Sequence, residues 1–424
     1  MRVSVIGLGY VGLPLAALLA KSHTVVGFDI DERRIDMIRG GHDVVKEPGL
    51  HGILKDSLKS GRLTVTAGRD QIRETEVKII TVGTPYDEKR GSVDYAQLDS
   101  ALDIVTGHIK NRDVIVLKST VPPGTTNGRL RRAVELAGFR IPGEVGLAYC
   151  PERLVEGQAI EDLGTLPKPI GATDKRSQEK VAKLFECLGG KIIRVSNPET
   201  AELIKILDNY ARYAFLGLTN EVALIAEKCG VNVYELLNSA KDNYPRNAGL
   251  LKPGPGVGGS CLNKDPFILR SEMKKKGLSL RMIGAAKSVN DKMPLHIAGL
   301  VSKFSGHRRK VCIAGVAFKG DTDDTRFSTA FEIREELKRR GFRVMLTDPY
   351  VVSKKVRVGK DLYSTLSRSD ILLVLCDHAI YKKMDLDKIK LQMRPNGLII
   401  DTRDVVDKAK AEETGFEYHG LGRL

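Results

Sequence analysis

A glycine-rich turn close to the N-terminus constrains the fold of this chain more strongly than any other feature. Residues 2–7 (RVSVIG) form a short β-branched run, typical of a buried parallel strand, and a GxGxxG turn overlaps its end. A helical pattern (LPLAALLAKS) and a second apolar run (HTVVGFDID) follow, and Asp29 closes that second run. Strand, glycine turn, helix, strand and acid, in this order, predict a dinucleotide-binding domain.

The turn and the acid also predict which dinucleotide binds. Glycine lets the backbone approach a pyrophosphate, and the helix N-terminus faces the phosphate charge. We expect the Asp29 carboxylate to bind the adenine ribose hydroxyls and to repel the additional phosphate of NADP, so NAD is the predicted cofactor. Asp31 is expected to face solvent. Glycine turns between strands and helices also occur without a ligand, and on sequence alone that explanation stays open.

Three further apolar runs in the first 152 residues end abruptly, at residues 77–85, 113–125 and 144–152. In open α/β sheets the carboxyl ends of the strands form the ligand crevice. This rule places four polar residues near the cofactor: Thr84, Ser119, Thr120 and Glu152. For each of them, the alternative is that such residues simply terminate strands.

Composition limits the remaining classes of protein. A chain of 424 residues is expected to hold two to three domains. No apolar run reaches the ~18 residues of a membrane span, and the apolar start lacks a basic leader, so we expect a cytoplasmic protein without a membrane partner. The formal net charge of +15 suits polyanions and phosphate-bearing small molecules, but no nucleic-acid-binding motif accompanies it, so no nucleic-acid partner is predicted.

The cysteines predict neither a disulfide framework nor a metal site. They form no CxxC pair and no zinc-finger spacing, and the six positions are Cys150, Cys187, Cys229, Cys261, Cys312 and Cys376. Several lie in apolar segments, where a free cysteine behaves as a small hydrophobe. Cys261 differs, because it follows the glycine-rich stretch GPGVGGS and is followed closely by Lys264 and Asp265.

The middle of the chain predicts one long helix, and the last third predicts a second α/β domain. Residues 198–229 have a continuous helical pattern, with Ser196 or Asn197 as N-cap and Gly230 as terminator. Such a length suits a spine between domains or a subunit contact. On it, Lys205 and Asn209 are four residues apart and point the same way. From about residue 308 strand and helix patterns alternate again without GxGxxG, so no second dinucleotide is expected there.

The predicted fold class is therefore α/β. Two Rossmann-like, doubly wound parallel-sheet domains are joined by a long central helix and a helical dimerisation region. The predicted boundaries are 1–197 for the NAD-binding domain, 198–304 for the central helical domain with the cysteine loop, and 305–424 for the C-terminal domain. In the segment FKGDTDDTR of that last domain, Lys319 and Arg326 are candidates for holding phosphates; a solvated charged loop is the alternative.

Separate motifs in one order resemble the UDP-sugar 6-dehydrogenases, the superfamily of UDP-glucose and UDP-N-acetylmannosamine dehydrogenases. The resemblance covers essentially the whole chain. It rests on VIGLGYVGLPLA, Thr84-Pro85, STVPPGT (119–125), CPERLVEG (150–157), the Lys205–Asn209 helix with Asn220-Glu221, GGSCLNKDP and GVAFKGDTDDTR.

The resemblance implies a reaction and a role for the cysteine. Family members oxidise the C6 alcohol of a UDP-sugar to the acid and reduce two NAD in succession. Cys261 matches the nucleophile that adds to the C6 aldehyde, and the resulting adduct is oxidised to a thioester that water hydrolyses. This agrees with the chemistry of the side chain, because a thiol is a good nucleophile for an aldehyde and neighbouring lysines favour its thiolate.

The resemblance also implies which residues form the site. Lys205 is expected to stabilise the oxyanion or act as base beside Asn209, Asp265 to activate water, and Thr120 and Glu152 to position that water. The predicted cofactor site comprises Gly7, Gly9, Tyr10, Val11, Gly12, Asp29, Arg34, Thr84, Thr120 and Lys264. The predicted substrate site comprises Glu152, Arg153, Leu154, Lys205, Asn209, Asn220, Arg246, Gly258, Lys319 and Arg403.

The sugar and the assembly are less sharply predicted. GPGVGG, DPFIL and SVNDKMP are similar to UDP-N-acetylmannosamine dehydrogenases, whereas GGSCLNKD and VEGQAIEDL are similar to UDP-glucose dehydrogenases; the acetamido sugar is favoured. A homodimer or a higher oligomer is implied, with Arg246 reaching the other subunit's site. A two-electron hydroxy-acid dehydrogenase and a non-catalytic nucleotide-sugar binder are the alternatives from other classes.

Overall fold

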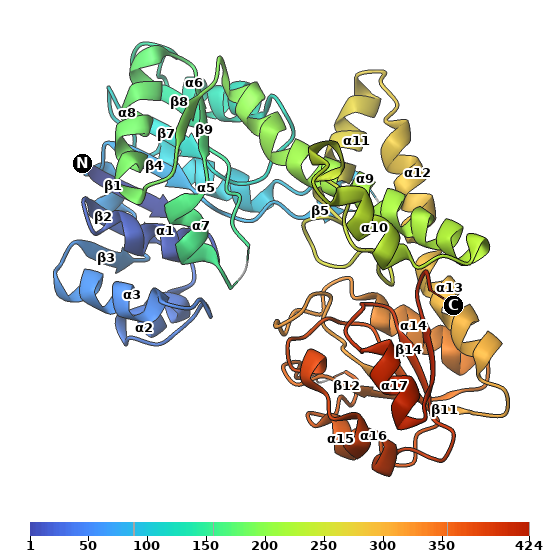
Figure 1. The fold of residues 1–424 in the computed structure, drawn as a ribbon. Helices are drawn as coiled ribbons and strands as arrows, with labels where there is room; N and C mark the ends of the chain where they lie inside the picture. The colour runs from blue at the N-terminus through green and yellow to red at the C-terminus, as the bar shows by residue number, and fades with distance from the viewer. Residues whose placement is uncertain (88–89, 156, 354, 424) are drawn as a thin grey trace. The chain divides into compact units, whose positions relative to one another are not determined.

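The chain folds into two compact units (Figure 1). The computed structural model describes residues 1–87, 90–155, 157–353 and 355–423. One unit comprises Met1–Asp208 with Ser271–Gly277, and the other Asn209–Arg270 with Leu278–Leu424. The three-part division with boundaries at 197 and 304 stays a prediction. Within the described ranges, no helix combines the length and apolar character that crossing a bilayer requires.

The first unit contains the predicted dinucleotide-binding sheet. Its order is β10-β9-β8-β7-β4-β1-β2-β3, from Ile192–Arg194, Lys168–Ala172, Gly146–Tyr149, Val114–Leu117, Val77–Ile80, Arg2–Ile6, Thr24–Phe28 and Leu63–Thr66. The strands pair in parallel, with one exception: β9 runs antiparallel to β8, with Tyr149 opposite Gly171. The predicted doubly wound parallel sheet is confirmed, and it departs from parallel pairing at β8 and β9, because the connection after β8 stays at the carboxyl edge and the chain turns back.

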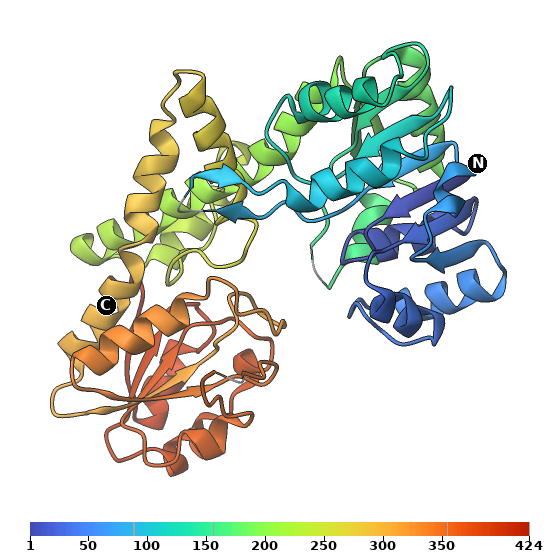
Figure 2. The ribbon, with the colours of Figure 1, turned by 180° about the vertical axis from the view of Figure 1, so that it is seen from behind.

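Helices cover both faces of this sheet, as the opposite views of Figures 1 and 2 show. They are α1 (Gly12–Leu19), α2 (Glu32–Arg39), α3 (Leu50–Lys59), α4 (Asp70–Arg73), α5 (Ala96–Thr106), α6 (Arg131–Leu136), α7 (Ala159–Thr165) and α8 (Lys175–Phe185), and a small hairpin pairs β5 (Tyr86–Asp87) with β6 (Ser92–Val93). Neighbouring strand residues alternate between the two faces, as the pleat requires. Thus Val114 and Val116 enter the core under α1 and α8, and Ile115 enters the core under α5.

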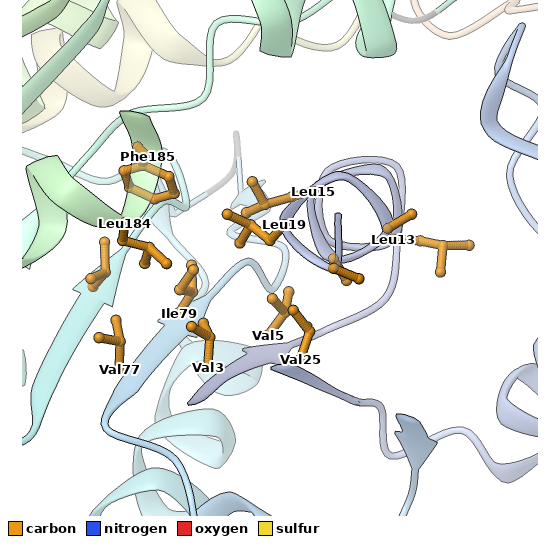
Figure 3. Close-up of a cluster of buried hydrophobic side chains, with 14 of the residues drawn as sticks. Val3, Val5, Leu13, Leu15, Leu19, Val25, Val77, Ile79, Leu184 and Phe185 are labelled. Atoms are coloured by element: carbon orange, nitrogen blue, oxygen red, sulfur yellow. The ribbon is translucent and has the colours of Figure 1, made fainter. Parts of the chain in front are cut away.

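Figure 3 shows the first of these cores, in which strand side chains meet helix α1. Val3, Val5 and Ile79 are fully buried against Leu15 and Leu19. Seven of the eight α1 residues are buried, so this helix lies between sheet and outer helices rather than on the surface. Its position fixes the glycine turn at the edge of the sheet.

One buried ion pair ties two central strands of this sheet together. The Lys78 ammonium on β4 donates to Asp113 Oδ2 at 2.7 Å and to the Thr75 carbonyl at 2.7 Å, and its side chain is fully buried. Burial lowers the pKa of Lys78, and Asp113 opposes that shift. Removing one partner of such a pair costs about 3–5 kcal/mol because the other charge stays buried.

The long helix α9 spans Pro198–Cys229, as the sequence predicts. Asn197 is its cap, since the Asn197 side-chain oxygen accepts from the Thr200 backbone N–H at 2.9 Å. Gly230 ends it with φ +67°, a conformation that glycine adopts without strain. Along the chain, α9 begins in the first unit and continues into the second.

The second unit holds a five-stranded, all-parallel sheet. Its order is β12-β11-β13-β14-β15, from Arg343–Thr347, Lys310–Ala314, Ile371–Val374, Leu398–Asp401 and Glu417–Gly420. The helices are α10 (Val233–Lys241), α11 (Asp265–Lys275, which ends in the first unit), α12 (Arg281–Asn290), α13 (Met293–Phe304), α14 (Thr329–Arg339), α15 (Leu362–Thr365), α16 (Leu386–Gln392) and α17 (Lys408–Thr414). The expected second α/β domain is confirmed.

The cysteines of the strands behave as small hydrophobes. Cys312 is buried within β11 and Cys376 lies buried just after β13, and burial raises the pKa of each thiol to about 12. Cys150 is buried as well, whereas Cys187, Cys229 and Cys261 are exposed. All six are free thiols.

Candidate functional site

The glycine turn of the first unit has the geometry that a pyrophosphate requires. Gly7 has φ +95°, and a Cβ on Gly12 would lie 1.8 Å from the Gly7 carbonyl oxygen, so both positions need glycine. Thr81, just after β4, donates its hydroxyl to that same carbonyl at 2.7 Å. Val11 occupies the N-cap of α1 and has no acceptor in its side chain, which leaves the first N–H groups of the helix for an anion.

Asp29 organises the turn and stands beside a cavity. Its Oδ2 accepts from the Leu8 N–H at 2.8 Å, and its Oδ1 accepts from the Asp31 N–H at 3.0 Å. Arg34 lies 3.6 Å from Oδ2. As expected, Asp31 is exposed, and it caps α2. Gly7, Gly9, Asp29 and Arg34 line a cavity of about 360 Å³ together with Phe28, Thr81, Val82, Gly83, Gln97 and Ser100.

The cavity includes residues that the sequence reading missed. Thr81, Val82 and Gly83 directly follow β4, so the rule that selected Thr84 could have found them. Gln97 lies in the first turn of α5, where no motif marks it, and its side-chain oxygen accepts from the Gly83 N–H at 3.1 Å. Tyr10, a predicted cofactor-site residue, is exposed and is not among the residues that line the cavity.

The carboxyl ends of β4, β7 and β8 are bound to one another by side chains. The Thr84 hydroxyl donates to the Thr120 carbonyl at 2.6 Å, and the Ser119 hydroxyl donates to the Val82 carbonyl at 2.6 Å. The Tyr149 hydroxyl donates to the Ser119 carbonyl at 3.1 Å. Three of the residues chosen by the strand-end rule therefore meet, as that rule predicts.

A buried glutamate connects the loop after Thr120 with the helix that carries Lys205. The Glu202 carboxylate accepts from the Gly124 N–H at 2.5 Å, the Thr126 N–H at 2.8 Å and the Thr126 hydroxyl at 2.6 Å. Burial raises the pKa of Glu202, and these donors oppose the shift. Lys205 lies three residues further on the same face of α9 and is half-buried; within the described part of the chain its ammonium has no recorded partner.

The loop after β8 carries Glu152, Arg153 and Leu154. Glu152 Oε1 accepts from the Arg153 N–H at 2.9 Å, and Arg153 binds Asp208 on α9 at 2.8 Å. Leu154 packs against the core under α1. Glu152 Oε2 is buried and makes no hydrogen bond to any described residue, although the Lys118 ammonium is 3.3 Å away.

In the second unit, Cys261 lies one turn before helix α11. Its carbonyl accepts from the Asp265 N–H at 2.9 Å and from the Lys264 N–H at 3.2 Å, and α11 begins at Asp265. The thiol is exposed. A helix N-terminus stabilises negative charge.

Asp265 is buried and contacts two other predicted site residues. Asn209 donates its amide to Asp265 Oδ2 at 2.6 Å, and the Lys264 ammonium lies 3.6 Å from Oδ1. Oδ1 makes no hydrogen bond to any described residue. Among the buried side-chain atoms of the described chain without a hydrogen bond, the carboxylate oxygens are Glu152 Oε2 and Asp265 Oδ1. Buried acceptors of this kind are satisfied by water.

Two glycines before Cys261 are closely packed by side chains of the second unit, and the predicted contact of Gly258 with substrate stays a prediction. A Cβ on Gly258 would lie 2.4 Å from Phe318 Cβ, and one on Gly254 would lie 2.5 Å from the Arg403 guanidinium. The loop is thus packed against the segments that contain Phe318, next to Lys319, and Arg403.

Asn220 holds the same loop through a hydrogen bond to its backbone. Its amide donates to Asn290 at 2.9 Å and its oxygen accepts from the Gly254 N–H at 2.9 Å, and the side chain is buried. A direct contact of Asn220 with substrate stays a prediction, but its amide is already engaged in holding the glycine loop.

The remaining predicted basic residues differ in their charge environment. Lys319 and Arg246 are exposed. Arg403 pairs with Asp377 at 3.1 Å. Arg326 pairs through two nitrogens with Asp324, so its charge is largely balanced within its own loop, which favours Lys319 over Arg326 as a phosphate ligand.

Three segments of the sequence match, in chain order, three domains of one protein family. They are the NAD binding domain, the central domain and the UDP binding domain of the UDP-glucose/GDP-mannose dehydrogenase family, over residues 1–189, 199–292 and 312–408. The chain belongs to this family. NAD is its cofactor, a UDP-sugar is its substrate, and it is a dehydrogenase. The turn, Asp29 and the cavity of the first unit fit the cofactor.

Three family members are similar over their whole length. The UDP-N-acetyl-D-mannosamine dehydrogenase of Methanocaldococcus jannaschii is 33% identical over 99% of this chain and 96% of its own. The solved UDP-D-ManNAc dehydrogenase of Pyrococcus horikoshii is 33% identical, with TM-score 0.90 and coverage of 100% and 99%. The solved UDP-glucose dehydrogenase of Pyrobaculum islandicum is 30% identical, with TM-score 0.87 and coverage of 100% and 98%.

The contacts of Asp29 predict how the family's preference for NAD can be altered. Asp29→Asn keeps an acceptor for the Leu8 N–H but removes the negative charge, which leaves Arg34 free to bind a 2′-phosphate. We expect the ratio of kcat/KM for NADP over NAD to rise roughly 10- to 100-fold, the value of one charge-assisted hydrogen bond.

Asp31→Asn is the matched control, because asparagine caps a helix as well as aspartate does. Its cofactor ratio should stay within about threefold of that of the unaltered protein. Equal shifts in the two variants, or equal use of both cofactors by the unaltered protein, would contradict the assignment of Asp29.

Proposed function

We propose that the chain oxidises the C6 alcohol of UDP-N-acetyl-D-mannosamine to the carboxylate, in two oxidations with Cys261 as covalent nucleophile. The observation that carries the proposal is the exposed thiol of Cys261 at the start of α11, in the same turn as the buried Asp265. A two-electron dehydrogenase needs no such thiol.

The proposed reaction uses Cys261 as the nucleophile and Asp265 as the proton acceptor. Bound NAD supplies the hydride acceptor for each oxidation. After the first one, Cys261 Sγ adds to the C6 aldehyde, and loss of a hydride from the adduct leaves a thioester. Water attacks the thioester carbon, the C–S bond breaks, and its electron pair stays on the sulfur as thiolate. The water proton passes to a carboxylate, for which Asp265 has a free buried oxygen.

We assign residues of the first unit roles in the same reaction, and these roles rest on the family motifs that contain the residues. Lys205 offers a cation for the developing oxyanion, and its ammonium has no recorded counter-ion among the described residues. Thr120 and Glu152 position water, and Glu152 Oε2 is a buried acceptor without a hydrogen bond there. For the UDP group we propose Lys319 and Arg403 as ligands.

The choice of sugar rests on the motifs and on the relatives. The two mannosamine dehydrogenases named above are each 33% identical to this chain, against 30% for the glucose enzyme. UDP-glucose is the second candidate, since Ser260 and Lys264 are similar to that branch. A panel of UDP-N-acetylmannosamine, UDP-glucose and UDP-N-acetylglucosamine with NAD, followed by nicotinamide absorbance, tests the proposal; preference for UDP-glucose would replace the acetamido sugar.

Replacing the nucleophile tests the proposed mechanism. Cys261→Ser keeps the shape of the side chain, but a hydroxyl is a far poorer nucleophile than a thiolate at neutral pH. We expect formation of the uronate to fall by about three orders of magnitude or more while NAD and UDP-sugar still bind, as measured by calorimetry. A serine ester hydrolyses slowly, so a covalent sugar adduct should appear in the intact mass.

Cys229→Ser removes another exposed thiol and should leave the rate unchanged. Cys312→Ala and Cys376→Ala should change the free energy of unfolding rather than the chemistry. Uronate formation by Cys261→Ser at the unaltered rate would exclude the covalent mechanism.

We further propose a homodimer formed through α9. Phe215, Leu218 and Ile225 on this helix are 38%, 45% and 53% exposed, and their spacing of three and seven residues places them on one face. A stripe of large apolar side chains on a helix this long is typical of a subunit contact.

Light scattering at micromolar concentration should give twice the chain mass, and Leu218→Lys with Ile225→Lys should give the mass of one chain. Substituting exposed Leu136 with lysine is the control, because it lies on α6 outside the stripe. A single-chain mass for the unaltered protein would contradict the dimer.

A further inference from the structure

A buried lysine at the end of β7 contacts the predicted water-positioning residue. Lys118 follows Leu117 directly and its side chain is only 4% exposed. Its ammonium donates to the Cys150 carbonyl at 3.2 Å and to the Pro151 carbonyl at 3.4 Å, and it lies 3.3 Å from Glu152 Oε2. One cation therefore contacts three consecutive residues of the turn after β8.

The charges around this ammonium identify Glu152 as its counter-ion. Burial alone would lower the pKa of Lys118, but Cys150 and Glu152 outweigh burial and raise it. Burial raises the pKa of the Cys150 thiol, whose sulfur lies 3.8 Å from the ammonium and further away than the Glu152 carboxylate. Lys168 on β9 is the other cation near this cluster, and it donates to the carbonyls of Leu166 and Gly189 instead. Glu152 is thus the anion that Lys118 balances.

The two oxygens of Glu152 are held differently. The Arg153 N–H binds Oε1, whereas Lys118 attracts Oε2 without making an aligned hydrogen bond to it. The carboxylate is fixed at both oxygens, and Oε2 keeps lone pairs for a further donor.

We propose that Lys118 is a positioning residue for the hydrolysis of the thioester, acting through Glu152. This inference rests on the function proposed above. Lys118 holds the Glu152 carboxylate so that Oε2 accepts a hydrogen bond from the attacking water. That water then forms its C–O bond to the thioester carbon as the C–S bond breaks. In the proposed function Glu152 positions the water of the last step, so we expect loss of Lys118 to slow that step.

Lys118→Met removes the charge at similar side-chain length. We expect kcat to fall at least tenfold and KM to change less than threefold. The first turnover of NAD should stay fast in a stopped-flow burst, and a sugar adduct on Cys261 should accumulate in quenched samples by intact mass. Glu152→Gln should give the same pattern. The double variant should be no slower than Glu152→Gln, since residues that act as one unit are non-additive.

Lys78→Met is the matched control, because Lys78 is also a buried, carboxylate-paired lysine of the same sheet. It should lower the melting temperature but leave kcat and the adduct level unchanged. Lys118→Arg keeps a cation and should recover most of kcat, which separates loss of charge from loss of packing if Lys118→Met folds poorly.

An unchanged kcat in Lys118→Met, a slow first turnover without adduct, or additive effects in the double variant would each overturn the positioning role. These outcomes are distinguishable from failure of the covalent mechanism, which shows itself as uronate formation by Cys261→Ser.

Discussion

In both units, a carboxylate after one strand holds the backbone of the turn that follows the neighbouring strand. Asp29 accepts from the Leu8 N–H at 2.8 Å, and Asp348 accepts from the Val316 and Ala317 N–H groups at 2.8 and 3.0 Å. These N–H groups lie beyond the ladder of the sheet and need an acceptor when they are buried. The crevice at the carboxyl edge of each sheet depends on this interaction, because it sets the path of the turn.

The aspartate that holds the turn is accessible to a ligand in the first unit and buried in the second. Asp29 borders a cavity of about 360 Å³ and lies beside Arg34, so its carboxylate is available to a ribose. Asp348 is fully buried and bound by His378 at 3.0 Å. Burial would raise the pKa of Asp348, but His378 and the two backbone donors lower it to about 2. A sealed carboxylate of this kind cannot bind ribose hydroxyls, which agrees with a single dinucleotide site in the first unit.

The sequence predicts well those features that depend on neighbouring residues, such as the ends of helices and the positions of strands. The borders of α9 follow from Asn197 and Gly230, and most strands follow from apolar runs with abrupt ends. The antiparallel β9 was missed because a run such as KPIGA carries no sign of direction, and β15 because EYHG is short and mixed. The strand-end rule found Thr84 and Thr120 because it reflects the topology of the sheet.

Contacts between residues far apart in the chain could not be predicted from the sequence. The glycines before Cys261 fit Phe318 and Arg403, which lie about 60 and 150 residues further along the chain. From the sequence, Glu202 is an ordinary acidic residue near the start of a helix, yet it binds the loop after Thr120. From the sequence, Lys118 is a charged residue at the end of a strand. Its proposed positioning role follows from its buried contact with Glu152, which the sequence does not reveal.

The central claim is that one protein carries out two oxidations at the same carbon, joined by the Cys261 adduct. The most direct measurement is the amount of NADH formed per UDP-sugar consumed at completion, with the sugar product identified by mass. A covalent relay through Cys261 requires two NADH and a uronate, with no free aldehyde. One NADH per sugar, with an aldehyde or ketone as product, would contradict it.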